Sequence, residues 1–184
     1  MMAQKGFYYD MTVCSGCKTC QIACNDKNNL EVGTLFRKVH VFEGGKFPKP
    51  WLYNISISCN HCENPKCAEN CPTGAIYKRA SDGVVVQDKE KCIGCKLCTW
   101  SCPYEAPKYK EDEQKVGKCD FCADLIDKGE NPACVDACLM RALKYGDIEE
   151  LKMEFGGTAD VKGLPDSSIT RPCVLIKPNS EAEL

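Results

Sequence analysis

Apolar and polar residues alternate along this chain in short runs. The segments YNISIS (53–58) and GVVVQD (83–88) are rich in β-branched residues and are predicted to be strands, and RKVHVF (37–42) is a third candidate. The stretch GAIYKRASDGVVVQD predicts a hairpin whose turn is Ser81-Asp82-Gly83. The pattern therefore indicates short strands.

Helices are expected to be short as well. The triplets QIA (21–23) and TWS (99–101) each suit a single helical turn, and DIEELKMEF (147–155) is the one ordinary helix, with Asp147 as a candidate N-cap. Three further segments are predicted to be loops or a solvated tail: FPKPW (47–51), GGTADVKGLPDSS (156–168) and NSEAEL (179–184).

Composition narrows the class of protein. The 184 residues are 43% hydrophobic and 27% charged, with a formal net charge of −2, which is typical of a folded globular protein and gives no reason to expect nucleic acid as a partner. No apolar run approaches about 18 residues, so we expect no direct membrane span. The N-terminal stretch MMAQKGFYYD has neither an apolar h-region nor twin arginines, so no export signal is expected.

Cysteine is the exceptional residue. It occupies 17 positions, a fraction at which folds are usually held together by sulfur or metal. Sixteen of these cysteines form four groups, each ending in C-x3-C: Cys14, Cys17, Cys20 and Cys24; Cys59, Cys62, Cys67 and Cys71; Cys92, Cys95, Cys98 and Cys102; Cys119, Cys122, Cys134 and Cys138. The segments CPTGAI, CPYEAP and CLMRAL place alanine at the same offset after three of the groups, so the groups form an internal repeat.

Three kinds of chemistry compete for these thiols. An odd number of cysteines and the absence of an export signal favour metal over disulfide bonds. Structural zinc usually takes two C-x2-C knuckles that lie well apart. Only the fourth group, with 11 residues between its inner cysteines, could pass for such a site in isolation, so zinc remains the weaker alternative to iron–sulfur clusters.

The spacing C-x2-C-x2-C, with Gly16 and Gly94 between ligands, is typical of a tight loop around an iron–sulfur cluster. The fourth cysteine lies farther along its helical turn and is lent to a neighbouring cluster, as in two-cluster ferredoxins. One hairpin joins groups two and three, so we expect these two groups to exchange ligands, and groups one and four to do the same around them. The predicted ligand sets of four [4Fe–4S] clusters are Cys59, Cys62, Cys67 and Cys102 (cluster A); Cys92, Cys95, Cys98 and Cys71 (cluster B); Cys14, Cys17, Cys20 and Cys138 (cluster C); Cys119, Cys122, Cys134 and Cys24 (cluster D).

Several segments carry a resemblance to a known family, namely CSGCKTC, ISCNHCENPKC, CPTGAIYKR, KCIGCKLC, SCPYEAP, KCDFC and VLIKPN. On these segments the chain resembles the four-cluster electron-transfer subunits of bacterial molybdenum oxidoreductases, and most of all the B subunit of dimethyl sulfoxide reductase. The resemblance spans nearly the whole chain. It departs at Leu139, where many relatives have proline, and at Cys173, which the pattern leaves over. Because Cys173 lies in the apolar run RPCVLIKP, it is predicted to be a buried, inert thiol.

The resemblance implies partners and a location. Relatives carry electrons between a membrane anchor that oxidises quinol and a catalytic subunit that holds a molybdenum cofactor. We therefore expect a non-catalytic subunit, associated with the membrane through its partners, on the periplasmic face after export with the catalytic subunit or else on the cytoplasmic face. The alternative is a free polyferredoxin, or a carrier that serves a hydrogenase or formate dehydrogenase.

The expected fold class is α+β, with two bacterial-type 2[4Fe–4S] ferredoxin-like modules made of short strands, short helices and long loops. The inner module (55–103) is inserted in the outer one (1–54 and 104–150), and a C-terminal arm (151–184) follows. No Ser–His–Asp set or phosphate-binding loop accompanies the cysteines, so the chain is not expected to catalyse bond chemistry itself.

Five other residues are candidates for roles near the clusters. His61 lies within C-N-H-C, but four cysteines already satisfy its cluster, so we expect it beside a cluster or at an interface and not as a ligand. His40 is expected to be a structural residue of a strand. Lys18 and Lys96 lie within ligand loops and are expected to be solvated, and Trp100 is expected to shield a cluster from water.

Overall fold

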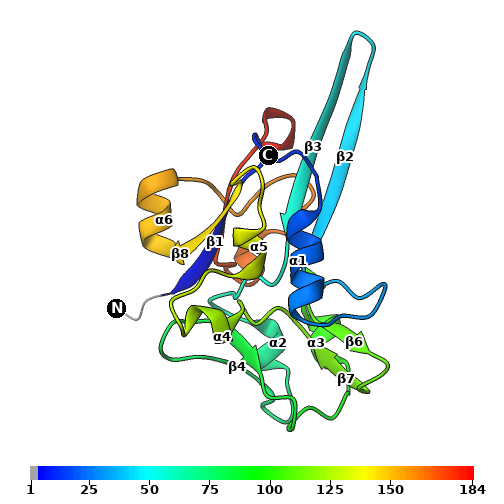
Figure 1. Ribbon diagram of the computed structural model, residues 1–184, viewed down its shortest axis with the longest axis vertical. Helices are drawn as coiled ribbons and strands as arrows, with labels where there is room; N and C mark the ends of the chain where they lie inside the picture. Colours follow the sequence, from blue (N-terminus) through cyan, green and yellow to red (C-terminus); the bar gives the residue numbers. More distant parts are fainter. Residues whose placement is uncertain (1–3) are drawn as a thin grey trace.

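The computed structural model describes residues 4–184 as a mixture of short strands and short helices, as expected for this fold class (Figure 1). The expectation about an export signal depends partly on residues 1–3, which lie outside the described residues. The strands are β1 Lys5–Asp10, β2 Lys38–Lys46, β3 Lys49–Ile57, β4 Ile76–Lys78, β5 Val85–Gln87, β6 Lys108–Lys110, β7 Lys115–Gly117, β8 Leu143–Asp147 and β9 Val174–Lys177. The helices are α1 Thr19–Lys27, α2 Lys66–Glu69, α3 Leu97–Ser101, α4 Ala123–Ile126, α5 Ala133–Asp136 and α6 Ile148–Phe155, with 3-10 turns η1 Ser167–Ile169 and η2 Ser180–Ala182.

A three-stranded sheet joins the two ends of the chain. Its strand order is β8-β1-β9, and β1 runs antiparallel to β8 and parallel to β9. Both faces of β1 are buried, because Tyr8 packs with Leu151 of α6 and Leu175, whereas Phe7 faces a larger core that contains Ile176. This burial explains why KGFYYD lacks the polar alternation of a half-exposed strand.

The predicted helix at 147–155 is confirmed as α6. Asp147 caps it, since its carboxylate accepts a hydrogen bond from the backbone N–H of Glu149 at 3.0 Å. Glu149 and Glu150 lie in the first turn, where their negative charges interact favourably with the positive end of the helix dipole. Within residues 4–184, none of the helices is long and apolar enough to cross a membrane.

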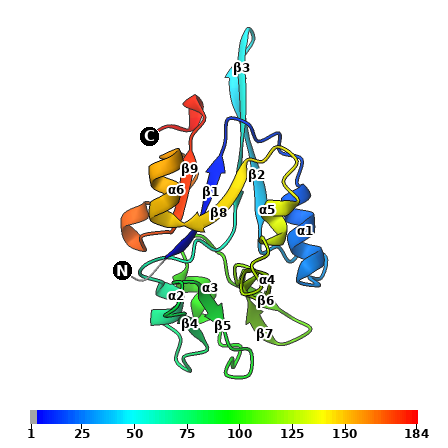
Figure 2. The same cartoon turned by 60° about the vertical axis from the view of Figure 1, so that its left-hand side comes forward.

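Two small hairpins gather at one end of the molecule. The predicted hairpin is confirmed: β4 pairs antiparallel with β5, and the chain reverses through Ser81-Asp82-Gly83. The second hairpin pairs β6 with β7. Figure 2 shows β4, β5, β6 and β7 with α2 and α3 on the opposite side of the molecule from the tip of the β2–β3 hairpin.

The prediction of a loop at FPKPW (47–51) is wrong in part. Strands β2 and β3 form a long hairpin that projects from the body (Figure 1), and β3 already begins at Lys49. Pro50 is tolerated within a strand here because a two-stranded ribbon leaves every residue near a free edge. Only the tight turn at Phe47 and Pro48 matches the expectation of irregular backbone.

The prediction of a solvated tail at NSEAEL (179–184) is also wrong in part. These residues contain η2, and Ala182 is fully buried in the main core. The backbone N–H of Lys162 donates to the carbonyl of Ala182, so the segment is held by the preceding loop. That loop, 156–168, is mostly irregular as expected, with a single bridge from Thr158 to Ile176.

Candidate metal centres

Three of the four predicted ligand sets each surround their own cavity. The four cysteines predicted for cluster A line a hollow whose remaining walls include Val85 and Ala106. The four predicted for cluster B line a second hollow with Ile76, and the four predicted for cluster C line a third hollow with Tyr9. In each case two sequence groups supply the lining, because Cys102, Cys71 and Cys138 lie with the neighbouring group and not with their own.

The fourth set gathers where α1 packs against α5 and where the Lys27–Asp124 ion pair links α1 to α4. All four of its cysteines are buried: Cys24, Cys119, Cys122 and Cys134. Burial raises the pKa of the Cys24 thiol to about 12, and the nearby Cys134 and Cys122 add to this rise. Burial likewise raises the pKa of Cys119, with Cys24 as the next cause. These thiols are therefore close enough to influence one another's charge.

The backbone repeats itself around the four groups. In every group the residue before the second cysteine has a positive φ: Gly16 at 71°, His61 at 45°, Gly94 at 69° and Phe121 at 66°. This left-handed conformation lets the loop turn sharply between two sulfurs, and it favours glycine. The prediction of tight loops at Gly16 and Gly94 is confirmed. The other two positions hold His61 and Phe121, which are fully buried and meet edge to face with ring centroids 5.0 Å apart.

Short helices carry the third cysteine of each group, and the fourth lies within the same helix or just after it. Helix α1 carries both Cys20 and Cys24, four residues apart, so the two sulfurs lie one turn apart along the helix. Cys98 lies in α3 and Cys102 directly follows it. One such turn can therefore present a sulfur to each of two neighbouring cavities, as the predicted exchange of ligands requires.

Two buried cations lie among the cysteines, and the sequence reasoning missed both. Arg37 is 2% exposed; it donates to the Ser56 carbonyl and hydroxyl at 3.2 Å and to the Ser58 hydroxyl at 2.9 Å. Burial by itself would lower the pKa of Arg37, but the attraction of nearby cysteines, Cys134 first among them, raises it overall. Lys118 is 5% exposed and its ammonium lies 3.7 Å from the Cys59 sulfur. The adjacency of Lys118 to a ligand cysteine was the available signal, whereas nothing local marks Arg37.

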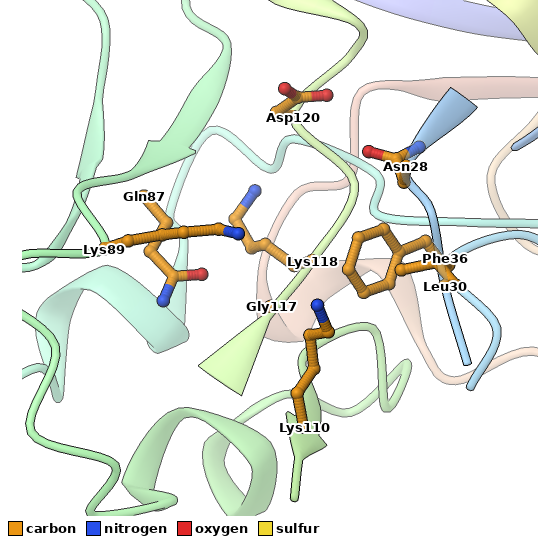
Figure 3. A pocket seen from close by; sticks show the side chains of 9 residues that line it. All are labelled: Asn28, Leu30, Phe36, Gln87, Lys89, Lys110, Gly117, Lys118 and Asp120. Atoms are coloured by element: carbon orange, nitrogen blue, oxygen red, sulfur yellow. The ribbon is translucent and has the colours of Figure 1, made fainter. Parts of the chain in front are cut away.

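A cavity of about 110 Å³ lies beside Lys118 (Figure 3). Lys89 and Lys110 also line it, but both are within ion-pair distance of Glu113. Within residues 4–184, Lys118 has no carboxylate within ion-pair distance. Lys118 instead donates to the carbonyl of Cys119 at 2.7 Å and to that of Val85, and its charge faces the Cys59 sulfur.

The donor sets fit iron–sulfur clusters. Each cavity is lined by four soft sulfur donors and walls that are nearly free of polar surface, which suits a compact inorganic cluster. A zinc ion would need its four sulfurs only about 3.8 Å apart, given Zn–S bonds of about 2.3 Å. No group of three His, Cys, Asp or Glu residues in the described range is arranged to hold a single ion. Arg37 and Lys118 further favour the thiolate form that burial alone opposes.

Comparison with known proteins identifies the family. Residues 50–148 match the model of the 4Fe-4S dicluster domain. The protein is 43% identical to a chain of the anaerobic dimethyl sulfoxide reductase of Haemophilus influenzae, over all of its own length and 93% of the relative. This chain is a member of the 4Fe-4S dicluster family of electron-transfer subunits.

Family membership extends to other reductases and dehydrogenases of sulfur compounds. A subunit of the sulfite dehydrogenase of Allochromatium vinosum is 38% identical over 81% of this chain and 71% of its own length. The thiosulfate reductase electron transfer subunit of Salmonella typhi is 36% identical over 79% of this chain and 77% of its own length. These comparisons confirm the predicted [4Fe–4S] cofactors and the assignment to a non-catalytic electron-transfer chain.

The other candidate residues of this dicluster protein have mixed outcomes. His61 does lie beside a predicted cluster ligand, with its Nε2 3.7 Å from the Cys119 sulfur, and His40 lies in β2. Lys18 is exposed as expected, but the Lys96 ammonium is seated 3.6 Å from the centre of the Tyr109 ring. The prediction that Trp100 shields a cluster is wrong, because its side chain is 77% exposed.

Cys173 is buried, as predicted, and its backbone N–H donates to the Asn60 carbonyl. Burial raises the pKa of its thiol to about 12, which leaves it protonated and unreactive at neutral pH. We expect Cys173→Ala to keep the full iron content of the protein and to lower the free energy of unfolding by only about 1 kcal/mol. Iron analysis of the purified variant tests this, and the loss of any cluster would assign Cys173 a role in ligation.

Proposed function

We propose that the four cysteine sets hold four [4Fe–4S] clusters, with the ligands of clusters A, B, C and D as predicted from the spacing. The observation that carries the proposal is the convergence of distant groups: the Cys102 sulfur lies with Cys59, Cys62 and Cys67, and not with the rest of its own motif. Cubic clusters supply one-electron oxidation and reduction when bound. The chain's own residues position the clusters, exclude water and supply nearby charge.

We further propose two ferredoxin-like modules, the inner one inserted in the outer, with the clusters in the order B, A, D, C. The cysteines that clusters A and B would exchange lie just after α2 (Cys71) and α3 (Cys102), and those that C and D would exchange lie in α1 (Cys24) and just after α5 (Cys138). Lys118 and His61 connect the two pairs, because they lie between Cys59 and Cys119. Such an order would make a single linear path through the protein.

Exposed apolar side chains at both ends of this path support a docked subunit over a diffusible carrier. Ile93 lines the cavity of cluster B and is largely exposed, as is Trp100 of α3. At the other end, Met140 lines the cavity of cluster C, and Leu139 beside it is exposed too. Apolar surface that a lone chain leaves open at both ends is typical of contact with other proteins.

The proposed function follows from this order and from the relatives. The chain would carry electrons between a quinol-oxidising membrane anchor, located beside cluster B, and a molybdenum-cofactor catalytic subunit, located beside cluster C, in a reductase of the dimethyl sulfoxide reductase type. Its proposed location is the periplasmic face of the membrane, held there by the partner subunits, with the cytoplasmic face as the alternative. The relatives are each named as one chain or one subunit of a reductase or dehydrogenase, and this supports a multi-subunit complex.

Anaerobic isolation from host membranes tests the proposal. The expected result is co-purification with a large chain that contains molybdenum and with an apolar anchor, together with four [4Fe–4S] clusters on this chain. A solitary, soluble, iron-loaded chain would instead support the free polyferredoxin or the carrier of a hydrogenase or formate dehydrogenase. Zinc in place of iron would overturn both.

A further inference from the structure

Lys118 bridges the two proposed modules through a buried charge. Its ammonium lies 3.7 Å from the Cys59 sulfur, a predicted ligand of cluster A, and donates to the carbonyl of Cys119, a predicted ligand of cluster D. Without a carboxylate partner in residues 4–184, this buried cation has sulfur as its nearest negatively charged group. A positive charge beside a cluster sulfur stabilises the reduced state, because reduction adds negative charge.

His61 makes the reciprocal contact. It belongs to the ligand loop of Cys59 and Cys62, but its Nε2 lies 3.7 Å from the sulfur of Cys119. The backbone N–H of Val85 donates to His61 Nδ1 at 3.0 Å, so Nδ1 is the acceptor and the ring proton of the neutral imidazole sits on Nε2. His61 therefore directs an N–H group at a predicted ligand of the other module.

One residue of β5 holds both side chains. Val85 is fully buried; its N–H binds His61 and its carbonyl accepts from Lys118. His61 also occupies a left-handed position that is glycine in the first and third groups, at a cost in backbone strain of about 1 kcal/mol. His61 is thus strained, fully buried and in contact with both Val85 and Cys119 at the junction of the two modules. This points to a role that glycine could not fill.

From this geometry we infer that Lys118 and His61 are positioning residues that raise the reduction potentials of clusters A and D and so match them for electron transfer between the modules. Lys118 acts on the cluster that Cys59 ligates, and His61 acts on the cluster that Cys119 ligates. The step they serve moves one electron from one cluster to the next; no covalent bond forms or breaks, and both side chains keep their protons. The inference rests on the ligand sets of the proposed function.

Redox titration followed by electron paramagnetic resonance, on the protein isolated anaerobically with its accompanying chains, tests the inference. In Lys118→Met the potential of cluster A is expected to fall, so that its reduced-to-oxidised ratio at a fixed ambient potential drops at least tenfold, equivalent to about 59 mV. In His61→Asn the potential of cluster D is expected to fall while that of A changes less. Asparagine keeps an acceptor for the Val85 N–H and tolerates the left-handed backbone, but it loses the Nε2 donor.

Matched variants make the result specific. Lys110 is equally buried but paired with Glu113, so Lys110→Met should leave both potentials unchanged. Lys118→Arg keeps the charge and should restore the potential of cluster A. Signals are assigned by their disappearance in Cys67→Ser for cluster A and Cys122→Ser for cluster D.

The outcomes separate this inference from the proposed function. Iron-loaded variants with unshifted potentials would overturn the inference and leave the proposed electron-transfer function intact, whereas a native protein without four clusters would overturn the proposed function itself. If Lys118→Met fails to assemble its clusters, the other two variants decide. The inference is overturned if the potential of cluster D is unshifted in His61→Asn. It is also overturned if the potential of cluster A falls in Lys118→Arg by as much as the loss of a charge would cause.

Discussion

Replacing Cys95 with serine is expected to convert cluster B to a three-iron form or to destroy it, while clusters C and D assemble normally. Cys95 lines the cavity of cluster B, at the end of the molecule that carries α2 and α3 (Figure 2). The sets of C and D depend instead on α1 and α5, on the far side of the junction. Iron analysis and electron paramagnetic resonance of the purified variant measure which clusters remain.

A second cysteine of the same motif supplies the control. Cys102 lies seven positions after Cys95 but lines the cavity of cluster A. The double variant Cys59→Ala/Cys102→Ala should therefore damage one cluster, and Cys98→Ala/Cys102→Ala should damage two. Damage to two clusters in Cys59→Ala/Cys102→Ala and to only one in Cys98→Ala/Cys102→Ala would contradict the exchange of ligands, and loss of all four clusters in Cys95→Ser would contradict the two-module pairing.

Replacing Arg37 with methionine is expected to prevent stable assembly of clusters C and D. The guanidinium is buried near Cys20, Cys24, Cys119 and Cys134, which belong to these two sets, and it also lies 4.8 Å from the centre of the Phe7 ring. Removing one partner from a buried charge network typically costs about 3–5 kcal/mol, because the remaining charges lose their compensation. The measurement is iron per chain, together with the rate of iron loss to a chelator.

Arg37→Lys separates charge from geometry. Lysine keeps the positive charge, but its single ammonium cannot reproduce the fork that contacts both Ser56 and Ser58. We expect clusters C and D to form in this variant and to lose iron faster than in the native protein. Full and stable iron loading in Arg37→Met would show that the buried cation is dispensable.

Local elements were predicted well where their determinants are local. The β4–β5 hairpin follows from β-branched runs around Ser81-Asp82-Gly83, and α6 follows from an Asp147 cap before an amphipathic run. The errors came from pairing and burial that the local pattern does not show. Proline in FPKPW suggested a loop, but the two-stranded β2–β3 ribbon accommodates it, and the burial of Ala182 depends on a loop far from it in sequence.

The sequence by itself determined the grouping of the cysteines and the cofactor class, because loops that wrap a cluster are built from residues a few positions apart. It also predicted which groups would exchange a cysteine, since C-x3-C places the last sulfur one helical turn away and one hairpin joins groups two and three. These features depend on backbone geometry that spacing alone reveals.

Only the tertiary structure decided what surrounds the sulfurs. Lys118 reaches Cys59, 59 positions away, and His61 reaches Cys119, 58 positions away, and both are held by Val85. Likewise, Arg37 is buried among cysteines of two groups, although nothing in its local sequence distinguishes it from a surface arginine. The charge environment of a cluster is a sum over neighbours in space, and chain distance does not specify those neighbours.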